Sequence, residues 1–235
     1  MWTLRGLFAI TLVIFCPAIT WANGLLYRLP DDGTGVVYEM TVKSKKREML
    51  VSGTLTMSSV GVKTIEGKRH RWIEFVMKLS HMKQDRTIVT KLLVPEDQLG
   101  KGKNPLTQCK KGWVRFLPKK AEALQKISGP EAGPIPAFLA GPLLDIKKLP
   151  MKEIETGIGK ISCTGESGRI GYLQGKTDVR VQYQTRLTEK SPFGVASSVL
   201  EIQEQRDGKT YEEVTITLKL KSILKNARTA LPQNH

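Results

Sequence analysis

The chain has 235 residues, of which 40% are hydrophobic and 25% are charged, and this composition excludes an intrinsically disordered protein. Its 21 glycines and 12 prolines are too few for a collagen-like chain and are typical of a β protein rich in loops. The 37 lysine and arginine residues outnumber the 22 acidic residues, so the formal net charge is +15; this charge either lies in solvated turns without a binding role or attracts anionic surfaces.

The first 22 residues have the features of a secretory signal peptide. Arg5 supplies a short positive region, residues 7–16 form an apolar stretch, and Thr20 and Ala22 are small residues suited to cleavage after Ala22. The apolar stretch is too short to span about 30 Å of hydrocarbon, and no later stretch is long and apolar enough for a transmembrane helix. We therefore predict an exported protein, periplasmic or extracellular; an uncleaved membrane anchor is the alternative.

Short alternating segments dominate the chain that follows the signal. Polar and apolar residues alternate, or β-branched residues cluster, over residues 36–42, 49–58, 70–79, 86–94 and 112–117. Charged or glycine-containing turns separate these segments, for example Glu66-Gly67-Lys68. This pattern predicts antiparallel strands with one face toward solvent.

The middle of the chain has a different character. Pro118–Ile127 begins with proline at a plausible first helical position and is predicted to form one short helix, ending at Gly129-Pro130. Ser128–Pro142 contains Gly-Pro three times around an apolar insert. We predict that this loop covers the sheet, with Pro136–Leu144 as a lid.

Strands are predicted again in the second half. Residues 160–164 and 169–173 flank a glycine-rich turn, and Asp178–Leu187 has the clearest alternation in the chain. Residues 195–205 and 211–222 are expected to form a hairpin across Asp207-Gly208. With residues 225–235 as a flexible tail, the prediction is a single, mainly β domain over residues 23–224.

Signals for catalysis or metal binding are missing from the sequence. His70, His81 and His235 have no metal-ligand spacing, and there is no nucleophile elbow. The glycines at 165, 168 and 171 are not set in a dinucleotide-binding unit. We predict a protein without enzymatic activity, metal or cofactor; a hydrolase with an unrecognised site is the alternative. Export argues against a nucleic-acid partner.

Cysteine usage suggests one disulfide. Cleavage after Ala22 would remove Cys16 and leave Cys109 and Cys163 in an oxidising compartment. A bond between these two would tie together the ends of the region that holds the predicted helix and lid. Two separate thiols are the alternative.

Four stretches resemble a family of secreted planctomycete proteins of uncharacterised function. These stretches are Tyr27–Gly33, Arg71–Glu74, Lys91–Pro95 and Ser191–Val195. The resemblance spans most of the chain after the signal. It implies an exported protein and no particular activity.

The signal, the long strands and the covering loop also resemble the periplasmic lipoprotein-carrier (LolA/LolB-like) fold. This resemblance implies an antiparallel sheet curled into a half-barrel or open barrel whose concave face holds acyl chains. Residues of that face would be Ile73, Phe75, Met77, Val179, Val181 and Tyr183. The hypothesis is therefore a non-enzymatic envelope protein that binds a lipid or another apolar ligand, although the same residues could form a filled core. The alternative is a structural or interaction module that binds anionic envelope partners through basic turns such as residues 43–47.

Overall fold

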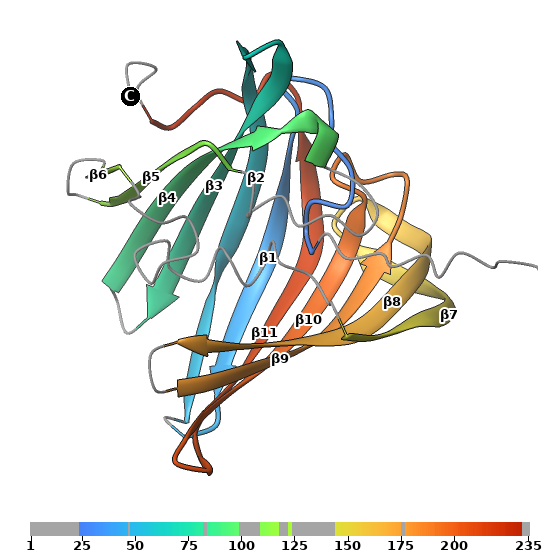
Figure 1. Cartoon of the computed structure of the whole chain (residues 1–235). Coiled ribbons are helices and arrows are strands. Elements are labelled where there is room, and N and C mark those ends of the chain that lie inside the picture. The colour runs from blue at the N-terminus through green and yellow to red at the C-terminus, as the bar shows by residue number, and fades with distance from the viewer. Residues whose placement is uncertain are drawn as a thin grey trace, which may run out of the picture.

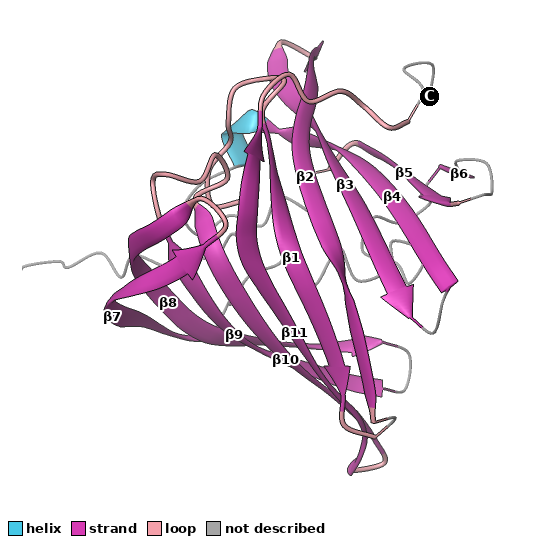
Figure 2. Cartoon of the chain, turned by 180° about the vertical axis from the view of Figure 1, so that it is seen from behind, coloured by secondary structure: helices cyan, strands magenta, loops and turns pink. Residues whose placement is uncertain are grey.

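The computed structural model describes residues 24–46, 48–81, 84–98, 109–117, 122–123, 144–174 and 177–231. The described strands form one antiparallel sheet of eleven strands in the order β6-β5-β4-β3-β2-β1-β11-β10-β9-β8-β7 (Figure 1). Between the edge strands β6 and β7 the described residues form no pairing, so this strongly curved sheet is not closed (Figure 2). The predicted antiparallel β architecture is confirmed at this level. The predicted signal peptide, residues 1–22, lies outside the described residues.

The chain runs through the sheet as two meanders that meet in the middle. The first half contains β1 (Gly35–Ser44), β2 (Met49–Ile65), β3 (Lys68–His81), β4 (Gln84–Pro95), the 3-10 turn η1 (Glu96–Gln98), β5 (Lys111–Phe116) and β6 (Glu122–Ala123). The second half contains β7 (Leu144–Thr156), β8 (Gly159–Gln174), β9 (Thr177–Leu187), β10 (Val195–Arg206) and β11 (Lys209–Leu224). Strand β11 returns beside β1 and joins the two halves.

Two hairpins have the turns that their sequences favour. Asp207 and Gly208 have φ values of 50° and 73°, and Glu66 and Gly67 have the same pair of values. Two successive residues with positive φ form the turn whose twist matches that of antiparallel strands. The hairpin predicted across Asp207-Gly208 is thus confirmed, with Arg206 paired to Lys209.

The hydrophobic core cluster of the described residues lies along one side of the sheet, which we call the inner face. Strand β9 shows how the sequence builds it, because residues of alternating burial point to opposite faces. Its inward residues are buried and the residues between them are exposed or partly exposed: Val179, Val181 and Tyr183 against Arg180, Gln182 and Gln184. Core residues from the strands of both halves belong to one cluster. The opposite side is called the outer face.

The predicted helix and lid are not supported where the structure describes them. Glu122–Ala123 form strand β6, and the rest of Pro118–Ile127 and all of residues 128–142 lie outside the described residues. Leu144 of the predicted lid begins β7 and is 54% exposed. No helix in the described ranges is long and apolar enough to cross a membrane.

Strand β7 was not predicted, and its composition explains why. It is an edge strand that contains Pro150 and several lysines, and most of its residues are exposed. Proline and lysine are tolerated on an edge because only one side of the strand must pair, and they discourage pairing with other chains. The strand therefore lacks the alternation by which the other strands were recognised.

Strand β8 is continuous where two strands and a turn were predicted. A side chain at Gly165 would place its Cβ 2.7 Å from the carbonyl oxygen of Thr185 on β9. This glycine therefore allows close approach of the neighbouring strand instead of a turn. The glycine-rich turn predicted between residues 164 and 169 is wrong.

The tip of the β7–β8 hairpin packs against β11, in the middle of the sheet. The amide of Gly157 donates to the carbonyl of Leu220 on β11 at 2.9 Å. This contact lies where the register between β1 and β11 shifts, beside Lys221. Any side chain at position 157 would overlap the Lys221 carbonyl, so glycine is required by space. Nearby on β8, Ile161 and Cys163 join the core cluster.

Candidate functional site

The six residues predicted to contact an apolar ligand all lie on the inner face. Three come from β3 and three from β9, and each is at most 3% exposed: Ile73, Phe75, Met77, Val179, Val181 and Tyr183. They belong to one core cluster, so the structure brings them to the same side of the sheet. Their burial shows that they serve as core residues in this state. Their contact with a ligand stays a prediction.

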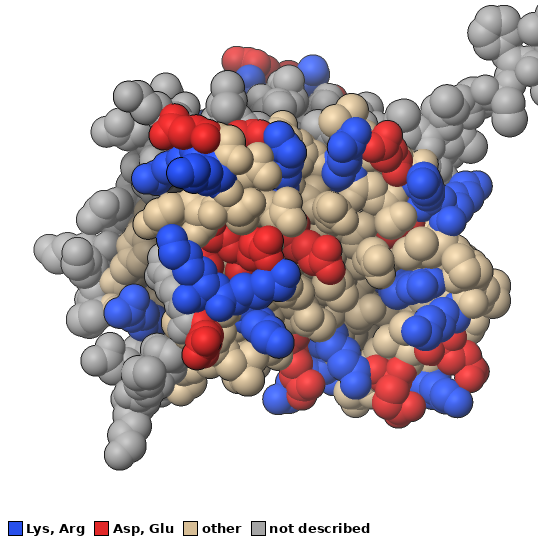
Figure 3. All heavy atoms as spheres, turned by 90° about the horizontal axis from the view of Figure 1, so that it is seen from below, with Lys and Arg blue, Asp and Glu red and all other residues tan. Residues whose placement is uncertain are grey.

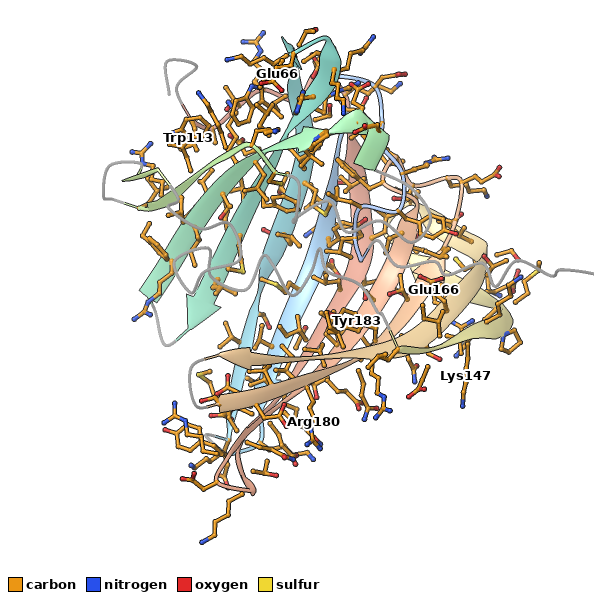
Figure 4. The ribbon with its side chains drawn as sticks, viewed as in Figure 1. Glu66, Trp113, Lys147, Glu166, Arg180 and Tyr183 are labelled. Atoms are coloured by element: carbon orange, nitrogen blue, oxygen red, sulfur yellow. The ribbon has the colours of Figure 1, made fainter. Side chains whose placement is uncertain are left out.

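A row of polar residues crosses the inner face between β8 and β10. Glu166 is paired in register with Thr185, and Thr185 with Ser198. The hydroxyls of Thr185 and Ser198 are 3.1 Å apart and hydrogen-bonded, and all three residues are at most 7% exposed. In Figure 4, Glu166 and Tyr183 lie toward the inner side, whereas Lys147 and Arg180 point away from it. This row could not be predicted from the sequence, because Glu166 lies where a glycine-rich turn was expected and Thr185 and Ser198 belong to separate strand patterns.

Burial controls the ionisation of Glu166, the one titratable member of this row. Desolvation raises the pKa of Glu166 to about 7. The pKa of Tyr27, in the N-terminal segment, rises to about 12 because of burial and the nearby Glu166 charge. A buried carboxyl group with a pKa near 7 can be protonated or charged at neutral pH. It is therefore a candidate hydrogen-bond partner for a polar group of a ligand.

Glu166 should make stability depend on pH. An acid whose pKa is higher in the folded state keeps its proton longer there, so folding loses stability as pH rises between about 4.5 and 7. We compare the free energy of unfolding of Glu166→Gln with that of the unmodified protein. The variant should be more favoured at pH 8 than at pH 5 by about 1–2 kcal/mol, a figure reduced for solvent screening. Urea unfolding of both proteins at the two pH values measures this. Glu153→Gln, at an exposed residue of β7, is the control, and an equal effect of Glu166→Gln at both pH values would contradict the prediction.

One buried hydroxyl of the inner face, Thr90 Oγ1, has no hydrogen-bond partner within the part of the chain that the structure describes. Thr90 is completely buried, and its register partners are Phe75 on β3 and Val114 on β5. Most buried polar groups in folded proteins are hydrogen-bonded, so each exception calls for a physical explanation.

A hollow of about 340 Å³, lined by polar and apolar surface in about equal parts, lies across β7, β8, β9 and β10. Gln182 and Gln184 line it, and they alternate along β9 with buried inward residues, which places the hollow on the outer face. Asp145 and Lys147 contribute from β7. The sequence offered no signal for this hollow, because its wall is the unpredicted strand β7.

Residues that carried the first family resemblance hold the N-terminal segment in place. Arg28 Nε donates to the carbonyl of Pro192 at 3.1 Å, and its backbone amide donates to Phe193 at 3.2 Å. Arg71 Nη1 donates to the carbonyl of Pro30 at 3.0 Å. These contacts join Tyr27–Gly33 to β3 and to the turn before β10.

The other stretches of that resemblance hold the C-terminal segment. Thr229 Oγ1 donates to Glu74 Oε2 at 2.7 Å and accepts from Lys91 Nζ at 3.1 Å. Residues 225–231, which we expected to be a flexible tail, are thus anchored to β3 and β4, and residues 232–235 lie outside the described residues. These motifs therefore have a structural role in tying down the chain ends.

The predicted disulfide is absent, and Cys109 and Cys163 are not bonded to each other. Cys109 precedes β5 and Cys163 lies within β8, and β4, β3, β2, β1, β11, β10 and β9 lie between those strands in the sheet. Burial raises the pKa of Cys109 to about 12 and also raises that of Cys163. A thiol with a raised pKa is poorly reactive at neutral pH. The prediction that this bond anchors a lid is therefore wrong.

The histidines give no metal centre in the part of the chain that the structure describes. His70 is 2% exposed and its Nδ1 lies 2.9 Å from the carbonyl oxygen of Lys68. Among the described residues, no group of three or more His, Cys, Asp and Glu side chains comes together. The side chain of His81 and residue His235 lie outside this description.

Comparisons with known proteins show distant structural likeness and no family. No family model matches the chain, and no curated protein matches it significantly. A predicted exported protein with a YmcC-like fold from Bacteroides fragilis is 9% identical, with 88% of this chain and 99% of that chain covered and a TM-score of 0.40. A predicted lipoprotein from Parabacteroides distasonis is 11% identical, with coverage of 86% and 99% and a TM-score of 0.36. A β-barrel-like protein of a domain of unknown function from Brucella abortus is 9% identical, with coverage of 84% and 98% and a TM-score of 0.27. Likeness at this level assigns neither a family nor a function.

Proposed function

We propose that the protein is an exported, non-enzymatic protein of the cell envelope that holds an apolar ligand, such as a lipid acyl chain, on the inner face of its sheet. The observation that carries this proposal is the single apolar cluster that runs along the inner face of an unclosed, curved sheet. Strands from both meanders contribute to it. Once the groups packed on it are displaced, such a face would offer an extended chain a continuous apolar surface, and burial contributes about 0.8 kcal/mol for each CH₂ group.

The polar groups of the inner side support a ligand with one polar end. Among the described residues, Thr90 Oγ1 has no hydrogen-bond partner, and Glu166, 7% exposed, lies in the same interior. A ligand carbonyl or hydroxyl could satisfy such a hydroxyl, whereas a purely structural core would contain apolar side chains there. Because Ile73 and Phe75 are completely buried, an acyl chain would reach them only by displacing the groups packed against them.

Binding of anionic partners through a basic surface is less well supported. Seen from below, lysine and arginine side chains are interspersed with acidic ones, and acidic side chains lie near the centre of that face (Figure 3). Several cations are paired on the surface, such as Lys45 with Glu213 and Lys221 with Glu39. Interspersed charges of both signs weaken the long-range field that steers a polyanion.

Native mass spectrometry of the protein purified from the envelope of its own host tests the proposal. We expect an adduct with the mass of a lipid, which is lost on delipidation and restored by incubation with a fatty acid. Protein without any adduct that also takes up no fatty acid would contradict the proposal.

Matched variants locate the ligand. Val181→Phe adds volume to the inner face and should reduce fatty-acid uptake, because close-packed interiors do not accept extra groups without displacement. Thr217→Phe, at an exposed position of β11, should leave uptake unchanged. Equal uptake by these two variants would place the ligand elsewhere, and circular dichroism checks that both are folded.

A further inference from the structure

We propose that the hollow on the outer face of β7–β10 is a second binding site, for a neutral polyhydroxylated ligand such as a sugar unit. Its volume of about 340 Å³ falls at the lower end of the range for small-molecule sites. This inference does not rest on the proposed lipid function, since the side chains that define the two sites point to opposite faces of the sheet, and Tyr183 is the one residue of the inner-face set that also borders the hollow.

Amide and hydroxyl groups line the floor of the hollow beside the apolar Val199. Gln182 is paired in register with Arg169 on β8 and Glu201 on β10. Gln184 is paired with Ser167 on β8. An amide side chain both donates and accepts hydrogen bonds, as a sugar hydroxyl does, so neighbouring amides can bind a row of hydroxyls. Regular strands hold these groups at fixed spacing, which reduces the entropy lost on binding.

The charges around the hollow are balanced. Asp145 and Glu201 are acidic, and Lys147 and Arg169 are basic. Arg169 Nε lies 2.5 Å from Asp145 Oδ2, so this pair already satisfies its own charges. A site for phosphate or another anion needs a surplus of donors or positive charge, and a site for a cation needs the reverse. The balance therefore favours a neutral ligand.

The wall formed by β7 is shaped by an irregularity in that strand. The register with β8 shifts between Leu144 and Lys147, and Asp145 has a φ of 51°. Aspartate tolerates this left-handed conformation better than most residues, and bulges of this kind re-aim side chains beside functional sites. Arg186 Nη1 on β9 donates to the carbonyl of Pro150 at 2.6 Å and fixes the same strand further along.

Isothermal titration calorimetry with N-acetylglucosamine and glucose tests the proposal, with glucose 6-phosphate and glucosamine as charged counterparts. We expect saturable binding of at least one neutral sugar, stronger than that of its charged counterpart. Gln182→Leu should weaken it about tenfold through loss of the amide hydrogen bonds. Gln205→Leu, an equivalent change on β10 outside the hollow, should bind like the unmodified protein.

A second measurement avoids reliance on the variant. In NMR titrations of the unmodified protein, the side-chain amide signals of Gln182 and Gln184 should shift with the bound sugar, and that of Gln205 should not. Absence of saturable binding of either neutral sugar, tighter binding of a charged counterpart, or shifts outside the hollow would overturn the proposal. Val181→Phe, which blocks the inner face, should leave sugar binding unchanged, so failure of one site is distinguishable from failure of the other.

Discussion

Glu74→Ala is expected to lower the free energy of unfolding by about 3 kcal/mol and to release the C-terminal segment from the sheet. Glu74 is 2% exposed on β3 and accepts three hydrogen bonds from that segment. The donors are Thr229 Oγ1 at 2.7 Å, the amide of Ala230 at 2.8 Å and the amide of Leu231 at 3.2 Å. Alanine would leave all three without this acceptor.

The same change would also affect the buried Lys91. Its Nζ donates to Thr229, its pKa is lowered by burial, and the charge of Glu74 counteracts that lowering. Removing the carboxylate leaves the ammonium group in a largely dry environment without its compensating charge, which is costly. The cost of Glu74→Ala therefore exceeds that of the lost hydrogen bonds alone.

Urea unfolding and amide hydrogen exchange measure the effect. In Glu74→Ala the amides of Ala230 and Leu231 should exchange faster, because their acceptor is lost. Glu39→Ala is the matched control: Glu39 is 58% exposed, it pairs with Lys221 at 3.7 Å, and its loss should cost less than about 0.5 kcal/mol. The prediction fails if the two variants unfold at the same urea concentration.

Predictions from the sequence succeeded where one face of a strand is buried and the other is wet. The alternation over Asp178–Leu187 predicted β9, because burial on one side alone forces a period of two. The turn at Asp207-Gly208 was predicted because its backbone conformation excludes most other residues. Both signals are local, so the sequence is sufficient for them.

Failures occurred where the environment is set by distant parts of the chain. Strand β7 is exposed over most of its length on both faces, so its sequence needs no alternation. Gly165 was taken for a turn residue because its close neighbour, Thr185, is remote in sequence. The pairing of Cys109 with Cys163 was inferred from the oxidising compartment and from the presence of two cysteines after signal cleavage. Neither fact indicates how far apart the two strands lie. The outer hollow depends on four strands at once and could not be read from any one of them.

The contacts at the chain ends were visible in the sequence only as a family resemblance. Arg71 and Glu74 lie three residues apart on β3, but they hold opposite ends of the chain through partners that are remote in sequence. In the sequence, buried charged residues of this kind cannot be distinguished from ordinary solvent-exposed polar residues of a strand. Their roles are therefore best tested by substitution.

Arg71→Lys is expected to cost about 2–3 kcal/mol even though it keeps the positive charge. Arg71 is 7% exposed. Its Nη1 donates at 3.0 Å both to the carbonyl of Pro30 and to Ser59 Oγ, and its Nε and Nη2 donate to Glu96 Oε1 at 3.1 and 2.9 Å. The planar guanidinium thus joins the N-terminal segment, the irregular part of β2 and the turn η1. A lysine ammonium also has three donors, but they share one nitrogen, whereas the acceptors around Arg71 are bonded by three separate nitrogens of the guanidinium.

Arg69→Lys provides the matched control for this change. Arg69 contacts the same carboxylate, with Nε 3.2 Å from Glu96 Oε2, but its side chain is 63% exposed. Its replacement should cost less than about 0.5 kcal/mol, because an exposed ion pair contributes little. Hydrogen exchange distinguishes a local from a general effect. The amide of Gly33, which donates to the Ser59 carbonyl at 2.9 Å, should lose protection in Arg71→Lys and retain it in Arg69→Lys. Equal stability and equal protection of Gly33 in the two variants would show that the fork of Arg71 does not hold the N-terminal segment.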